Sequence, residues 1–141
     1  MYDLESGETS YLTPMREPRW HFSGSCYDTL GWAVVSTYYP EYPKLPEKWG
    51  DHEVFMVELT KRKNPLPMVW RIAHTRSVFK KYSDAPFAKI NKKGTKIWFG
   101  AGWGNSYQDG SYDVYQIDLP KSWFHDLTNI AKTRPLSSKT R

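Results

Sequence analysis

The stretch that decides the fold is residues 96–119, which read KIWFGAGWGNSYQDGSYDVYQIDL. Apolar and aromatic side chains dominate residues 96–103, and residues 112–119 mix apolar with polar side chains in near alternation. Such runs predict strands, and the Gly, Asn and Asp residues between them are typical of a turn or loop. This stretch therefore predicts a pair of antiparallel strands.

An earlier part of the chain repeats the pattern. Residues 31–38 read GWAVVSTY and residues 52–59 read HEVFMVEL, and the second of these lies 60 residues before YDVYQIDL. A further strand is predicted at residues 68–74, and residues 91–95, NKKGT, predict a tight turn with glycine where a positive φ is convenient.

Residues 2–12 look like a third, partial copy, with the turn ESGE at residues 5–8 between two short strands. Residues 2–120 are thus predicted to form nine antiparallel strands in groups of two, four and three, without a helix longer than about two turns. The best helical signal is a short turn at residues 121–127, KSWFHDL.

The composition bounds the class of protein. The chain has 141 residues, enough for one domain, and its apolar runs are too short for a transmembrane helix. The single cysteine, Cys26, excludes an intrachain disulfide and a CxxC metal site, and is expected to be a small buried hydrophobe. The first five residues, MYDLE, do not resemble an export signal.

The net charge of +5 is a weak argument for nucleic-acid binding, because four basic residues lie within residues 131–141. We therefore expect a partial β-fold over residues 1–130, with strand groups at 2–19, 20–77 and 84–120. Residues 131–141 are expected to be a basic, flexible and dispensable tail.

Several motifs resemble those of β-propellers of the TolB-like and oligogalacturonide-lyase-like kind. NKKGTKIWF at residues 91–99 is similar to their S-P-D-G-x-x-I-x-F turn, although NKK replaces the usual Pro-Asp pair, and residues 2–7 are similar to their D-x-x-T-G hairpin. HFS at residues 21–23, GW at 31–32 and AHTRS at 73–77 resemble motifs of extracellular bacterial propellers.

The resemblance implies an all-β fold of antiparallel four-stranded blades, with about two blades present, and an extracellular or periplasmic origin. Because a propeller closes with four or more blades, two blades leave apolar faces uncovered. Three explanations stay open: a fragment of a longer propeller, a ring completed by oligomerisation, or an open two-sheet sandwich covered by loops. For an oligomer, we expect residues 2–12 of one chain to pair with residues 112–119 of another.

Four polar residues are candidates for ligand binding. His21 lies at the entry of the first strand of the middle blade, and the innermost strand of a blade would line the channel. His74 ends the strand at residues 68–74, and Arg76 and Ser77 follow it. Arg can bind a carboxylate or phosphate in a forked geometry, and His can act as a base or metal ligand. Each of these residues also has an ordinary structural interpretation as a packed or solvated side chain.

In oligogalacturonide lyases, which this chain resembles, channel histidines hold a divalent metal, so the resemblance raises the question of a metal site here. That ligand set is not recoverable from this sequence, so we predict no metal site, assign no catalytic residue and leave enzymatic activity open. The turn at residues 109–113, DGSYD, lacks the spacing of a calcium loop.

The aromatic residues suggest a sugar ligand. Seven Trp, 10 Tyr and 6 Phe make up 16% of the chain, and flat aromatic rings match the apolar faces of sugar rings. Most strand aromatics, Trp98 included, are expected to pack between blades, so the candidates for sugar stacking are the loop residues Trp49, Trp103 and Tyr107.

The leading hypothesis is thus a carbohydrate- or ligand-binding propeller module of a secreted bacterial polysaccharide-processing protein. The alternatives are a structural module that completes a ring by self-association and, below it, a metal-assisted polysaccharide lyase. A membrane partner is not expected, and the nearly neutral body argues against nucleic acid.

Overall fold

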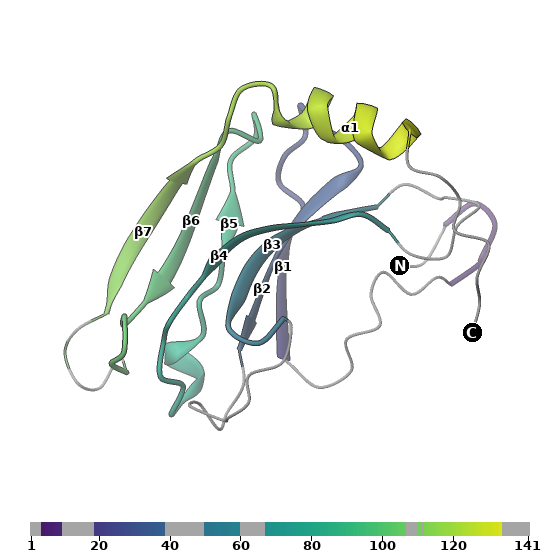
Figure 1. Ribbon diagram of the computed structural model, residues 1–141. Helices are drawn as coiled ribbons and strands as arrows, with labels where there is room; N and C mark the ends of the chain where they lie inside the picture. Colours follow the sequence, from purple (N-terminus) through teal and green to yellow (C-terminus); the bar gives the residue numbers. More distant parts are fainter. Residues whose placement is uncertain are drawn as a thin grey trace.

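The computed structural model describes residues 4–9, 19–38, 50–59, 67–106, 110 and 112–133 (Figure 1). Within these ranges the elements are β1 (Arg19–Ser23), β2 (Trp32–Tyr38), β3 (Glu53–Glu58), β4 (Val69–His74), the short 3-10 helix η1 (Tyr82–Asp84), β5 (Lys89–Ile90), β6 (Lys96–Ala101), β7 (Asp113–Asp118) and α1 (Trp123–Thr133).

The strands form two antiparallel sheets, each with its strands in chain order. The first sheet is β1-β2-β3-β4 and the second is β5-β6-β7. Val34 pairs with Met56 between β2 and β3, and Phe99 pairs with Tyr115 between β6 and β7. The prediction of a mainly β fold in groups of four and three strands is confirmed, whereas the arrangement as propeller blades stays a prediction.

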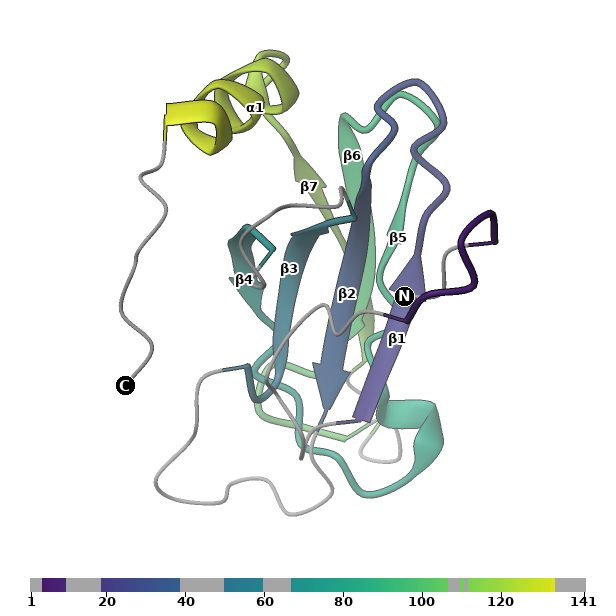
Figure 2. The same ribbon diagram turned by 90° about the vertical axis from the view of Figure 1, so that its right-hand side faces the viewer.

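The two sheets pack face to face around one apolar core. β2 and β3 contribute Trp32, Val34, Val54 and Met56, and β6 contributes Ile97, Phe99 and Ala101. The sheets approach each other where β5 lies against β1 and β2 (Figure 2). The core therefore lies between two consecutive meanders whose first strands are neighbours.

The central strands β2 and β3 are buried on both faces. On the face away from the second sheet, Ala33, Val35, Phe55 and Val57 are at most 5% exposed and pack with Trp20. Two-sided burial explains why residues 32–38 and 53–58 read as nearly continuous apolar runs.

The helix α1 is longer than the sequence indicated. It has 11 residues, about three turns, where a short turn at residues 121–127 was expected, and it includes the first three residues of the expected tail, 131–133. Trp123 is its anchor: the indole contacts Trp32 and Trp70, and its Nε1–H donates to the Gly94 carbonyl over 2.6 Å. Through these contacts α1 lies across one end of both sheets (Figure 1).

The predicted amino-terminal hairpin falls mainly outside the described residues. Residues 4–6 form a turn and Thr9 makes an isolated bridge, while residues 1–3 and 10–18 lie outside the described ranges. Seven of the nine predicted strands are thus found in the described part of the chain. There, no helix is long and apolar enough to cross a membrane.

Candidate functional site

The structure brings four of the predicted site residues to one end of the sandwich. His74 is the last residue of β4, Arg76 and Ser77 follow that strand, and Trp103 follows β6. Backbone hydrogen bonds tie the two segments together, because the Gly104 N–H donates to the Arg76 carbonyl over 2.6 Å. The Gly102 N–H in turn donates to the Ser77 hydroxyl over 3.2 Å.

The backbone of this loop end is strained. His52, Arg76 and Trp103 have φ angles of 51°, 50° and 46°, in the left-handed region that non-glycine residues rarely adopt. The Thr75 N–H donates to the His52 carbonyl over 2.7 Å, and the Arg76 N–H donates to Nδ1 of His74 over 3.0 Å. These hydrogen bonds fix the loops at the point where regular strand pairing has ended.

His21 belongs to a different cluster. Its ring packs 4.3 Å from that of Phe87 and 5.3 Å from that of Tyr38, between centroids, and Nε2 is buried without a hydrogen-bond partner among the described residues. Burial lowers the pKa of His21, which favours the neutral ring. Trp49 and Tyr107 lie outside the described residues.

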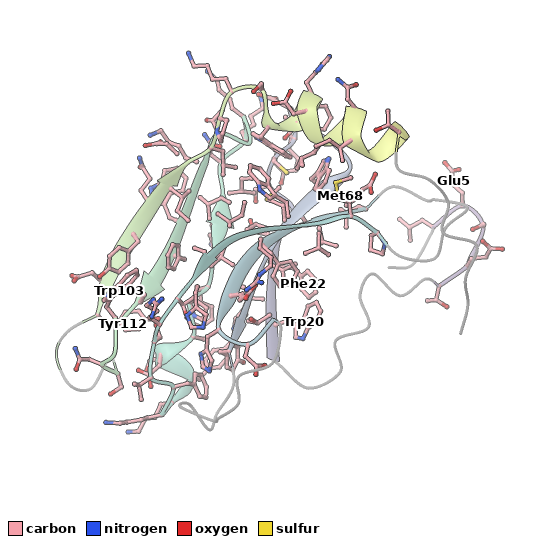
Figure 3. The ribbon with its side chains drawn as sticks, viewed as in Figure 1. Glu5, Trp20, Phe22, Met68, Trp103 and Tyr112 are labelled. Carbon is pink, nitrogen blue, oxygen red and sulfur yellow. The ribbon has the colours of Figure 1, made fainter. Side chains whose placement is uncertain are left out.

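A groove of about 290 Å³ opens on the face of the second sheet that points away from the core. This volume is at the small end of the roughly 300–1,000 Å³ typical of small-molecule pockets. Its lining is mostly apolar and includes Phe87, Trp98, Gly100, Tyr112 and Val114, with Ser83 and Lys89 as polar groups. Figure 3 shows Tyr112 and Trp103 on the β6–β7 side of the molecule, away from Trp20 and Phe22.

Tyr112 and Gly100 build the base of the groove. A Cβ on Gly100 would lie 2.4 Å from Cε1 of Tyr112, so only glycine leaves room for this ring. The Tyr112 hydroxyl donates to the carbonyls of Asp84 and Ala85 over 3.0 and 3.1 Å. Burial, followed by the nearby Asp84, raises the pKa of Tyr112 to about 12 against the opposing hydrogen bond with Ser77, so the phenol stays neutral.

Trp98 forms a wall of the groove and is fixed by a polar neighbour. Its Nε1–H donates to Oε1 of Gln116 over 3.0 Å. Farther along the same face, Lys96 Nζ lies 2.7 Å from Oδ1 of Asp118, and the Gln116 amide also donates to that carboxylate. Hydrogen bonds from Lys96 and Gln116 lower the pKa of Asp118. One half of this face is therefore apolar and the other half is charged.

The sequence did not single out the groove. Trp98 was expected to pack between blades, yet its side chain is only partly buried, and Phe87, Gly100 and Tyr112 were not among the predicted site residues. The only available signal was position: Trp98 alternates with the buried residues Ile97 and Phe99 and so faces outward.

The described residues hold no group of three or more His, Cys, Asp or Glu side chains arranged to bind a metal ion. Comparison with known proteins adds no relatives, since no family model, curated protein or solved structure matches this chain.

Proposed function

We propose that this protein is a carbohydrate-binding module whose ligand occupies the groove on the outer face of β5, β6 and β7. The observation that carries the proposal is the partly exposed Trp98 indole, held by Gln116 in a mostly apolar groove. A fixed aromatic ring can stack on the C–H face of a sugar without losing much rotational freedom. The Lys89 ammonium and Ser83 hydroxyl are available for hydrogen bonds to sugar hydroxyls.

The charged half of the same face favours a small ligand, rather than a further blade, as the occupant of this face. Lys96 and Asp118 form an ion pair with side chains 41% and 68% exposed. Covering this pair with a further blade would remove both charges from water, which is costly. A ligand confined to the apolar half leaves the ion pair solvated.

The proposal includes a partial propeller from a secreted polysaccharide-processing protein. Two consecutive meanders, packed face to face with β1 beside β5, support that architecture. The resemblance of the motifs at residues 91–99 and 73–77 is the remaining support.

The test is affinity electrophoresis through gels that contain soluble glycans, namely hydroxyethylcellulose, xylan, galactomannan and pectin. We expect one of them to retard the wild-type protein, and Trp98→Ala to weaken that binding by at least about tenfold, or about 1.4 kcal/mol. Tyr27→Ala is the matched control, because Tyr27 is also aromatic, is 65% exposed and does not line the groove.

Failure of every glycan to retard the folded wild-type protein would reject carbohydrate binding. Loss of binding in Trp103→Ala, with Trp98→Ala unaffected, would move the site to the loop end that holds Arg76 and His74.

Self-association is the second candidate function, because Val114 is 75% exposed on β7, the last strand of its sheet. Uncovered apolar surface next to a sheet edge favours strand addition from another copy. Sedimentation that gives a stable monomer at micromolar concentration would reject this alternative, whereas a closed ring without glycan binding would favour it.

A further inference from the structure

Phe87, at the edge of the groove, is held in a conformation that aromatic residues avoid. Its φ angle is 43°, in the left-handed region, and its side chain is 39% exposed. A bulky residue in this region costs free energy, and the ring leaves more than a third of its surface exposed instead of burying all of it to offset that cost. Such a residue indicates a role for the ring beyond packing.

The residues on either side of Phe87 are anchored to both sheets. The Pro86 carbonyl accepts a hydrogen bond from the Gly100 N–H on β6 over 2.8 Å. The Ala88 N–H donates to the hydroxyl of Ser36 on β2 over 3.0 Å. Pro86 and Ala88 are buried, so the chain between them turns Phe87 outward.

The Phe87 ring is also supported from behind. His21 lies 4.3 Å away and the ring of Tyr82 lies 5.1 Å away in an edge-on orientation, between centroids. On its other side the Phe87 side chain lines the groove together with Trp98. The ring therefore has a fixed position at the groove although the backbone beneath it is strained.

We propose that Phe87 is a ligand-contacting and specificity-determining residue, and that with Trp98 it forms a two-sided aromatic site for a single hexopyranose unit of a glycan. This inference rests on the proposed carbohydrate-binding function. A groove of about 290 Å³ fits a small ligand. Two aromatic walls select rings that present C–H groups rather than axial hydroxyls.

Three substitutions separate the contact from the strain. Phe87→Ala removes the ring and keeps a residue that disfavours positive φ, whereas Phe87→Gly removes the ring and also the strain. Phe87→Tyr keeps an aromatic ring. Each variant and the wild type are titrated by NMR with an oligosaccharide of the glycan that retards the wild-type protein, and their melting temperatures are compared.

We expect Phe87→Gly and Phe87→Ala each to lose at least about tenfold in affinity, Phe87→Tyr to bind within about threefold of wild type, and Phe87→Gly to melt at a higher temperature than Phe87→Ala. Wild-type affinity in folded Phe87→Gly would overturn the proposed contact between the Phe87 ring and the sugar, while the proposed carbohydrate-binding function would stand. A lower melting temperature for Phe87→Gly than for Phe87→Ala would overturn the strain argument. A wild-type protein that binds no glycan would overturn the proposed function together with this inference.

Discussion

The stability of this protein should fall in mild acid because of His52. The His52 side chain is 2% exposed, and its ring centroid lies 6.2 Å from that of His74. Burial, together with the charge of His74, lowers the pKa of His52 from 6.5 to about 4, against a smaller opposing effect of Asp51. The folded state therefore keeps His52 neutral under conditions in which the unfolded chain protonates it.

The sign and size of the effect follow from proton linkage. Between pH 6.5 and pH 4 the unfolded state binds more protons at this position than the folded state does, so stability falls as the pH falls through this window. This difference in the pKa of His52 between the unfolded and folded states lowers the free energy of unfolding by about 3 kcal/mol in total. The full loss is reached below about pH 4, where both states are protonated. Set against a typical total of about 5–15 kcal/mol, this is a large part of the stability.

The assay is urea unfolding, followed by tryptophan fluorescence, at a series of pH values from 7 to about 4. His52→Asn removes the titrating group, and Asn tolerates the φ angle of 51° at this position. In this variant most of the fall in stability between pH 7 and about pH 4 should disappear. A smaller fall should remain because of His21, whose pKa is also lowered. His125→Asn, on the exposed surface of α1, is the control.

An unchanged decline in His52→Asn would refute this reasoning. So would an NMR titration of the folded protein that places the pKa of His52 near 6.5.

Two further substitutions test the packing that supports the groove and the helix. Gly100→Ala should lower the free energy of unfolding by about 1–3 kcal/mol, because the new methyl group meets the Tyr112 ring. Gly24→Ala is the control: its Cβ would have no atom within 4 Å, so it should change the free energy of unfolding much less in the same urea titration. Equal effects of the two substitutions would contradict the close approach of Gly100 and Tyr112. Trp123→Phe should lower the free energy of unfolding by about 1–3 kcal/mol, since the buried Gly94 carbonyl loses its hydrogen-bond donor. The circular dichroism signal of α1 should then be lost before the sheets unfold. Unchanged stability would contradict the anchoring role of Trp123.

The parts of the fold that follow from local sequence were predictable. In the turn at residues 91–95, Asn91 Oδ1 accepts hydrogen bonds from the backbone N–H groups of Thr95 and Lys96 over 2.7 and 3.0 Å, and Gly94 has a φ of 66°. These are short-range requirements that Asn and Gly meet at those positions. The strands at residues 32–38 and 53–58 were visible for the same reason, as apolar runs between turn signals.

The groove was not predictable because it depends on contacts between distant residues. The outward turn of Phe87 needs the Gly100 N–H and the Ser36 hydroxyl, which lie 13 and 51 residues from it in the sequence. The position of α1 against the sheets depends likewise on Trp123 reaching Trp32 and Trp70, which are distant from it in the sequence. By contrast, the proximity of His74 and Arg76 followed directly from their positions at the end of a strand and just after it.

The unequal burial of the strands distinguishes the centre of the first sheet from the edges of both sheets. Every residue of β2 and β3 is buried, whereas no residue of β4 or β7 is, and in β5 and β6 the buried residues are Ile90, Ile97, Phe99 and Ala101. Local opening requires least free energy where the fewest apolar contacts are lost, so in the second sheet it is expected first at β7. The groove lies on that sheet. Opening of β7 would therefore separate Gln116 from the Trp98 indole and remove Val114 from the groove, while the cooperative unit formed by β2 and β3 stays folded.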